Sequence, residues 1–246
     1  MHRFFAEEQN ISKDHILLTG GDVNHVQHVL RLSVGDCVQV SDGKKYLYEC
    51  MIDACEEEEV RLSILRRVLA HTELSSKITL FQALPKGDKM EVIIQKSVEL
   101  GVFEVIPVAT KRCVVKLDER KAARKTERWN AISESAAKQS GRGIIPEVRT
   151  PMAFDTALAV AQEYDHILIP YELSEGMKDT REVMSRIKPG ESVAIFIGPE
   201  GGFEILEIEL AKAAGARAIS LGKRILRTET AGLAILSVLM MQLEDE

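Results

Sequence analysis

Three glycines in five residues stand directly after a short apolar run. The segment Gly198-Pro199-Glu200-Gly201-Gly202 follows Val193–Ile197. Glycine permits unusual backbone dihedrals and lets backbone N–H groups approach a ligand with no side chain between them. The segment matches neither G-x-G-x-x-G nor a P-loop, so no fingerprint supports dinucleotide or nucleoside-triphosphate binding. The alternative is a sharp strand-to-helix turn that binds nothing.

A second segment, residues 221–231, is polar yet leads into the most apolar predicted helix of the chain. It reads Leu-Gly-Lys-Arg-Ile-Leu-Arg-Thr-Glu-Thr-Ala. A helix that starts near Thr228, Glu229 and Thr230 offers free N–H groups, hydroxyls and one carboxylate at a single point. The alternative is that these side chains only cap a buried helix start.

Both segments need a scaffold, and apolar runs alternate with helical patterns beyond residue 77. This alternation predicts a mainly parallel sheet with helices on both faces. The predicted strands are 78–84, 105–108, 167–169, 193–197 and 218–221, and the predicted helices are 89–100, 119–140, 179–187, 204–214 and 230–243. Ligands collect outside the carboxyl ends of such strands, so we expect both segments to line one crevice.

The first seventy residues follow a different pattern. Short strands are predicted at 15–18, 37–40, 46–52 and 60–65, with one helix at 22–32. Several short strands with one helix indicate a small β-barrel. The polar stretch 70–76 marks a boundary, and we predict one domain over 1–72 and another over 73–246.

Composition limits the class of protein. Of 246 residues, 45% are hydrophobic and 28% are charged, which excludes a mostly disordered chain, a collagen-like repeat and a coiled-coil rod. No run of about 18 apolar residues predicts a membrane span, and the N-terminus lacks the apolar region of a signal peptide. We therefore expect a cytoplasmic protein.

The cysteines and histidines do not predict a metal site. Cys37, Cys50, Cys55 and Cys113 form no C-x-x-C pair, and the six histidines include no H-E-x-x-H motif. We expect the cysteines to be small buried hydrophobic residues and the protein to hold no metal.

Positive charge is concentrated in the middle of an acidic chain. The net charge is −6, yet residues 111–149 contain eleven Lys/Arg against five Asp/Glu. A confined basic stretch suits contact with a polyanion at one face. A solvated helix surface with internal ion pairs explains the same count.

With these motifs in view, the chain closely resembles the RsmE family of 16S ribosomal RNA methyltransferases, which belongs to the SPOUT superfamily. The resemblance spans nearly the whole length. The residues that carry it are Arg3-Phe4-Phe5, His25-Val26, 29–32, 86–91, 94–102, Arg112-Cys113, Val115-Lys116, 139–142, Ile145-Pro146, 197–203 and 221–231.

The resemblance implies a reaction and an architecture. The family transfers a methyl group from S-adenosylmethionine to ring nitrogen 3 of one uridine in 16S ribosomal RNA. The implied α/β fold has an N-terminal PUA-like β-barrel that helps to bind RNA and a C-terminal SPOUT domain with a deep trefoil knot. SPOUT enzymes are typically homodimers, so the apolar last helix is either partly interfacial or simply core.

The resemblance also assigns residues to S-adenosylmethionine. The implied cofactor-binding residues are Gly198, Pro199, Glu200, Gly201, Gly202, Leu221, Gly222, Ile225, Leu226, Arg227, Thr228, Glu229, Thr230 and Ala231. One departure is Glu204, because many relatives carry a small hydroxyl residue there to cap the next helix. An acid can also cap a helix, so we do not expect this departure to remove activity.

Two residues are the predicted catalytic groups. Arg227 is expected to orient the uracil or to stabilise charge that builds on its oxygen, unless it only ties down Glu229 or the Glu200 loop. Glu229 and Glu200 are candidates to accept the imide proton, but hydrogen bonding to the cofactor is the interpretation we favour for both. The target uridine must be unpaired or flipped out to present its imide edge.

A set of cations over both domains is expected to contact RNA phosphates. It comprises Arg3, Arg31, Lys86, Lys89, Arg112, Lys116 and Arg142. The expected partner is 16S ribosomal RNA or the assembled small subunit. Two rival hypotheses stay open: a SPOUT enzyme that acts on transfer RNA or large-subunit RNA, and a non-catalytic ribosome-assembly factor that kept the fold.

Overall fold

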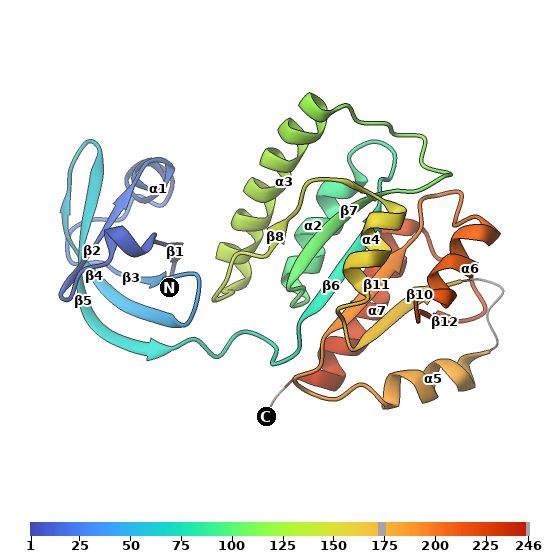
Figure 1. Ribbon diagram of the computed structural model, residues 1–246. Helices are drawn as coiled ribbons and strands as arrows, with labels where there is room; N and C mark the ends of the chain where they lie inside the picture. The colour runs from blue at the N-terminus through green and yellow to red at the C-terminus, as the bar shows by residue number, and fades with distance from the viewer. Residues whose placement is uncertain (172–175, 245–246) are drawn as a thin grey trace. The chain divides into compact units, whose positions relative to one another are not determined.

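The computed structural model describes residues 1–171 and 176–244, and the chain divides into two compact units (Figure 1). The first unit comprises Met1–Glu73 and Ala137–Ile145, and the second comprises Leu74–Ala136 and Pro146–Glu246. Residues 137–145 lie in the predicted C-terminal domain but belong to the first compact unit. No helix among the described residues is long and apolar enough to cross a membrane.

The first unit is built on a five-stranded sheet in the order β1-β3-β4-β5-β2. The four predicted strands are present and extend beyond their predicted ends, while β1 was missed. The strands are β1 (Arg3–Phe5), β2 (His15–Thr19), β3 (Cys37–Ser41), β4 (Tyr46–Cys55) and β5 (Glu59–Leu69). Only the β1–β3 ladder is parallel. Alternate residues of these strands face a core that includes Phe4, Ile16, Val38 and Leu62.

The predicted helix at 22–32 is shorter and irregular. One turn, α1 (Gly21–Asn24), continues into a π-helical stretch, η2 (His25–Val29), and Arg31 then adopts a φ of 55°. Val23 and Val26 are buried as the helical spacing predicted. A short 3₁₀ turn, η1 (Glu8–Asn10), precedes β2.

The second unit is an α/β layer with a parallel sheet, as predicted. The strands are β6 (Ile78–Ala83), β7 (Glu104–Ala109), β8 (Glu147–Val148), β9 (Met152–Ala153), β10 (His166–Pro170), β11 (Val193–Ile197) and β12 (Arg217–Ile219). They follow the order β12-β10-β11-β6-β7-β8, with β9 paired to β7. Every residue of β6 and β11 is buried, which explains the continuous apolar run of β11 and the mostly apolar β6, where Thr79 and Gln82 are the buried polar residues.

Helices lie on both sides of this sheet. They are α2 (Lys89–Glu99), α3 (Glu119–Ser140), α4 (Phe154–Ala161), α5 (Met177–Ser185), α6 (Ile205–Ala213) and α7 (Thr228–Leu243). Gly232 of α7 packs on Leu80 and Ile197. The neighbouring residues Phe81 and Phe196 point to the opposite face, into a core shared with α4 and α6. Helix α4 was not predicted from the sequence, and the trefoil knot stays a prediction.

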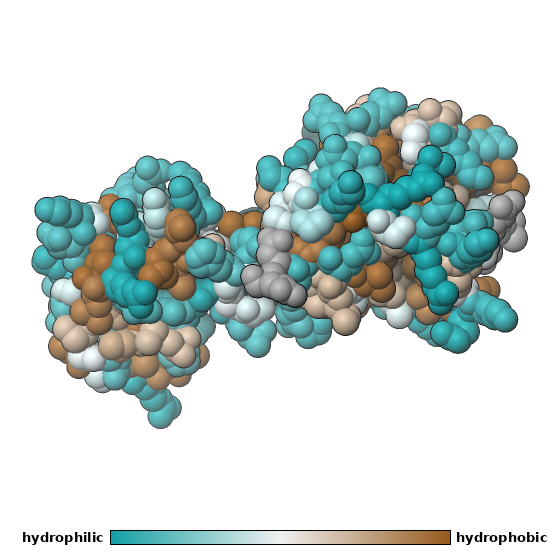
Figure 2. Space-filling model, turned by 90° about the horizontal axis from the view of Figure 1, so that it is seen from below, coloured by the Kyte–Doolittle hydropathy of each residue, from teal (hydrophilic) through white to brown (hydrophobic). Residues whose placement is uncertain are grey.

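The last helix is mostly core. Ile235, Leu236 and Leu239 are buried, as the core interpretation predicted, whereas Val238 and Met241 are exposed. On the face in Figure 2, hydrophobic residues lie between hydrophilic ones, so apolar side chains do reach the surface.

Candidate functional site

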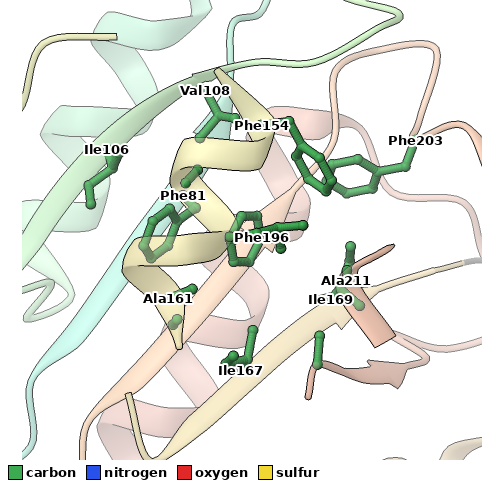
Figure 3. Close-up of a cluster of buried hydrophobic side chains, with 14 of the residues drawn as sticks. Phe81, Ile106, Val108, Phe154, Ala161, Ile167, Ile169, Phe196, Phe203 and Ala211 are labelled. Carbon is green, nitrogen blue, oxygen red and sulfur yellow. The ribbon is translucent and has the colours of Figure 1, made fainter. Parts of the chain in front are cut away.

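The glycine segment forms a tight turn at the carboxyl end of β11. The Gly202 N–H donates to the carbonyl oxygen of Pro199 at 2.9 Å, and Gly202 has a φ of +67°. A Cβ on Gly198 would lie 3.2 Å from the ring of Phe203. That ring points toward Phe154, with 5.8 Å between ring centroids (Figure 3). The turn is therefore anchored to the aromatic core, which accounts for glycine at 198.

The second segment follows β12 and enters α7 two residues earlier than predicted. Gly222 adopts a φ of +110°, a conformation that side chains rarely tolerate. Ile225 is exposed, while Leu221 and Leu226 are half-buried. Within α7, Ala231 is half-buried and Thr230 is exposed. The segment thus turns sharply and presents part of its backbone to solvent before the helix begins.

Thr228 joins the two segments. Its Oγ1 donates to the carbonyl oxygen of Gly198 at 2.7 Å and accepts a hydrogen bond from Gln82 Nε2 at 2.9 Å. The residue that precedes α7 is Arg227, and no side chain caps this helix start. The capping interpretation of Thr228 is therefore wrong, because its hydroxyl binds the other loop. The two segments do meet, although β10 separates β11 from β12 in the sheet.

Lys89, at the start of α2, binds both carboxylates of the site. Its Nζ donates to Glu200 Oε1 at 3.0 Å and lies 3.3 Å from Glu229 Oε2. The backbone N–H of Lys86 also donates to Glu200 Oε1, at 3.1 Å. Partial burial acts to raise the pKa of Glu200, but hydrogen bonds from backbone N–H groups and from Lys89 lower it overall. The hydrogen bond to Glu200 in turn raises the pKa of Lys89.

Arg227 does not take part in this cluster. Its side chain is exposed, and among residues 1–171 and 176–244 it forms no ion pair with Glu229 or Glu200. The alternative in which Arg227 ties down these carboxylates is therefore wrong, since Lys89 does so. The Arg227 side chain is therefore accessible from solvent.

Arg112 also contacts the glycine turn. Its Nη1 donates to the carbonyl oxygen of Gly201 at 2.8 Å, and its Nε lies 4.0 Å from Glu204 Oε1. Glu204 forms a capping box at the start of α6, in which its own N–H donates to Glu207 Oε2 at 2.8 Å. An acid does cap this helix, as expected. Lys116 is exposed.

The three cations predicted in the first unit differ in their surroundings. Arg31 is exposed. Arg142 is buried and binds the Glu73 carboxylate through Nε and Nη2. Arg3 is half-buried and donates to the carbonyl oxygen of Gly141 and to Gln39 Oε1.

Neither a disulfide nor a metal cluster is found within the described part of the chain. Cys50 and Cys113 are buried free thiols, as expected, but Cys37 and Cys55 are exposed, because each lies at an end of its strand. The prediction of burial is therefore wrong for these two cysteines. No group of three or more His, Cys, Asp or Glu side chains is placed so that it could hold an ion.

Comparison with known proteins decides the family. The family model described as "RNA methyltransferase domain" matches residues 72–240, and that described as "RNA methyltransferase PUA domain" matches residues 18–65. Ribosomal RNA small subunit methyltransferase E of Bacillus subtilis is 35% identical, and the match covers 99% of this chain and 98% of the relative. This chain belongs to the ribosomal RNA small subunit methyltransferase E family.

Solved structures agree with this assignment to the methyltransferase E family. The family member from Neisseria gonorrhoeae, bound to S-adenosyl methionine, has 33% identity and a TM-score of 0.85, covering 98% of this chain and 97% of that one. A Legionella pneumophila protein in complex with the bound cofactor SAM has 35% identity and a TM-score of 0.86, covering 97% and 96%. The resemblance found in the sequence is confirmed, as are the PUA-like and methyltransferase domains.

Sequence reasoning missed two contributors to this family member's site. Gln82 lies at the end of the buried strand β6, and a polar residue in an otherwise apolar run was the signal that could have found it. Lys89 was predicted as an RNA contact, but a lysine in the first turn of a helix is unfavourable there unless acids lie nearby. Those acids come from segments more than a hundred residues away, so only the fold reveals them.

Proposed function

We propose that this protein transfers the methyl group of S-adenosylmethionine to ring nitrogen 3 of one uridine in 16S ribosomal RNA. Membership of the methyltransferase E family supports the rRNA substrate. The observation that carries the proposal is the 2.7 Å hydrogen bond from Thr228 to Gly198, which holds two backbone-rich loops together at one edge of the sheet.

The residues of the joined loops fit S-adenosylmethionine. The space beside Gly202 and Gly222 is open where a Cβ would stand, so a ligand can approach the backbone there. Gln82 Oε1 is buried and accepts no hydrogen bond from the described residues, which leaves an acceptor beside Thr228. Buried polar atoms are normally paired, and a ligand amine or hydroxyl would satisfy this one.

The holding residues are those of the two loops. We assign the cofactor to the backbone and side chains of 198–202, 221–222 and 225–231, with Glu200 and Glu229 near its hydroxyl or amine groups. When bound, S-adenosylmethionine supplies a methyl group that is already activated by the sulfonium. The protein's own task is then to align the acceptor nitrogen and to exclude water.

The acceptor nitrogen needs electrostatic help. The imide nitrogen of uracil is protonated at neutral pH and must lose its proton as it attacks. We assign Arg227 to a uracil oxygen, where its exposed guanidinium stabilises the negative charge that develops. If the Glu229 carboxylate separates from Lys89, it is the proposed acceptor of the imide proton. While it stays paired with Lys89, we assign it to a hydrogen bond with the cofactor.

The RNA must present a flipped or unpaired uridine to this site. Arg31, Lys86 and Lys116 remain the proposed phosphate contacts because their side chains are exposed. Arg112 also remains a proposed contact, because its side chain is exposed although Nη1 donates to the Gly201 carbonyl oxygen. Arg3 and Arg142 are already engaged within the first unit, and Lys89 within the second. We propose a cytoplasmic homodimer, in which the exposed Val238 and Met241 of α7 face the partner.

Mass mapping of modified nucleosides tests the proposal. RNA from a strain that lacks this protein should lose one N-methylated uridine in small-subunit RNA, and the wild-type gene should restore it. An unchanged modification map contradicts the proposal. A loss in transfer RNA or large-subunit RNA identifies the rival substrate, and a folded protein that does not bind S-adenosylmethionine in calorimetry identifies the assembly factor.

A further inference from the structure

Lys89 occupies a position that helix energetics disfavour. It is the first residue of α2, where the partial positive charge of the helix dipole repels a cation. Its ammonium is nevertheless held within 3.3 Å of two carboxylates. Helix stability does not account for a lysine at this position. We therefore explain the lysine by its contacts with the two carboxylates.

The two partners belong to different loops of the site. Glu200 is the central side chain of the glycine turn after β11, and Glu229 lies in the first turn of α7. The side chains of Lys89, Glu200 and Glu229 are 31%, 29% and 26% exposed, so solvent screens them less than fully exposed pairs. Without the ammonium, two carboxylates would face each other across the loops and repel.

We propose that Lys89 is a positioning residue that holds the glycine turn and the start of α7 at the spacing required by S-adenosylmethionine, and that it is not an RNA contact. The proposal rests on the cofactor site proposed above. Lys89 acts through Glu200 and Glu229, in parallel with the neutral Thr228–Gly198 hydrogen bond. The link through Lys89 is ionic, so charge-neutralising substitutions break it and leave the Thr228–Gly198 hydrogen bond in place.

Lys86 provides a matched control for Lys89. It lies three residues before Lys89, its side chain is exposed, and only its backbone N–H contacts Glu200. Lys86 as a phosphate contact and Lys89 as a loop bridge therefore predict different effects of substitution on RNA binding and on the loops. Loss of a phosphate contact weakens RNA binding and lowers its salt dependence, whereas loss of the bridge alters the loops even in the absence of RNA.

The experiment compares Lys89→Met and Lys86→Met in the full-length protein. Hydrogen exchange of the ligand-free protein should show faster exchange in 198–203 and 221–231 for Lys89→Met only. Calorimetry should show S-adenosylmethionine binding weakened roughly tenfold in Lys89→Met and unchanged in Lys86→Met. Under steady-state conditions, Lys89→Met should raise the KM for S-adenosylmethionine and leave kcat at saturation nearly unchanged.

Two further variants distinguish an ionic bridge from a general packing effect. Lys89→Arg keeps the charge and should recover most of the affinity for S-adenosylmethionine. Adding Glu229→Gln to Lys89→Met should weaken binding by less than the product of the two single effects, because both remove one interaction.

Specific results would overturn the inference. Wild-type hydrogen-exchange rates in both loops of Lys89→Met would show that Lys89 does not bridge the loops. A lower salt slope of RNA binding in that variant would show that Lys89 contacts RNA instead. If the wild-type protein itself does not bind S-adenosylmethionine, the proposed function fails. The exchange comparison still tests the bridge in that case, because it uses no ligand.

Discussion

Each unit contains one cluster of oppositely charged side chains, and the two clusters differ in geometry. In the first unit the Arg142 side chain is 5% exposed, and its fork meets both oxygens of Glu73, which also accepts the Gly143 N–H at 2.7 Å. In the second unit one half-exposed lysine serves two glutamates. The first cluster balances one cation with one anion, whereas the second carries a net negative charge beside open backbone.

This difference separates a structural ion pair from the proposed binding site. The Arg142 pair fixes residues 137–145 to the first unit, with Ser41 Oγ donating to the Gly143 carbonyl oxygen at 2.6 Å. In such a pair the charged groups already bind each other, so they are not available to a ligand. The Lys89 cluster keeps an excess carboxylate charge next to loops with free N–H groups, which suits a cationic cofactor.

The largest expected effect concerns the first cluster. Arg142→Met should lower the free energy of unfolding by about 3 kcal/mol, because it leaves the Glu73 carboxylate without its partner. Urea unfolding followed by circular dichroism measures it, and binding of S-adenosylmethionine should be unchanged. The exposed Arg124→Met on α3 is the control and should stay within ~0.5 kcal/mol of wild type. Equal stability of both variants would remove the contrast between the clusters.

The next largest effect tests the site itself. Arg227→Ala should reduce the single-turnover rate at saturating S-adenosylmethionine by about 10²-fold, because a developing charge on uracil loses its stabilising cation. Arg224→Ala, which removes an exposed neighbour, should retain most of the rate. An unchanged rate in Arg227→Ala excludes the catalytic role, and normal folding of the variant is verified by its unfolding midpoint.

A smaller effect is expected where the two loops meet. Thr228→Val keeps the shape of the side chain but removes the hydrogen bonds to Gly198 and Gln82. The partly buried Gly198 carbonyl oxygen loses its donor, and the buried Gln82 Nε2 keeps only its bond to the Ala83 carbonyl oxygen. The free energy of unfolding should therefore fall by about 1–2 kcal/mol, and S-adenosylmethionine should bind more weakly. Thr230→Val, at an exposed position of the same helix, is the stability control. A neutral result at 228 would mean that the loops do not depend on this bond.

The smallest effect is pH-dependent and lies far from the loops in sequence. Burial is the main cause that raises the pKa of Tyr164 to about 12, from about 10 in the unfolded chain, and its hydroxyl donates to Glu104 Oε1 at 2.8 Å. Since the folded pKa is raised, this stability is complete below pH 10 and is lost as pH rises toward 12. Between pH 9 and 11, wild type should lose up to about 1 kcal/mol more than Tyr164→Phe. Parallel pH profiles of the two proteins would contradict the assignment.

How much the sequence predicted depended on the range of the interactions involved. The strands β6 and β11 were recognisable because burial on both faces makes β11 wholly apolar and β6 mostly so. In contrast, β1 and α4 escaped notice: β1 is three residues long and exists through its ladder to β3, and α4 carries no charged face that would mark its period. Local patterns cannot report pairings that are made across the chain.

The sequence by itself determined the parallel α/β unit, the strand-rich first unit and the family, and it singled out the two loops that are proposed to bind the cofactor, because each depends on local periodicity or on ordered motifs. Only the tertiary structure decided what the charged residues do. It placed Arg142 on Glu73, Lys89 between Glu200 and Glu229, and left Arg227 without a carboxylate partner among the described residues. A charge looks the same in a sequence wherever it lies, and its role follows from the neighbours that folding brings within a few ångströms.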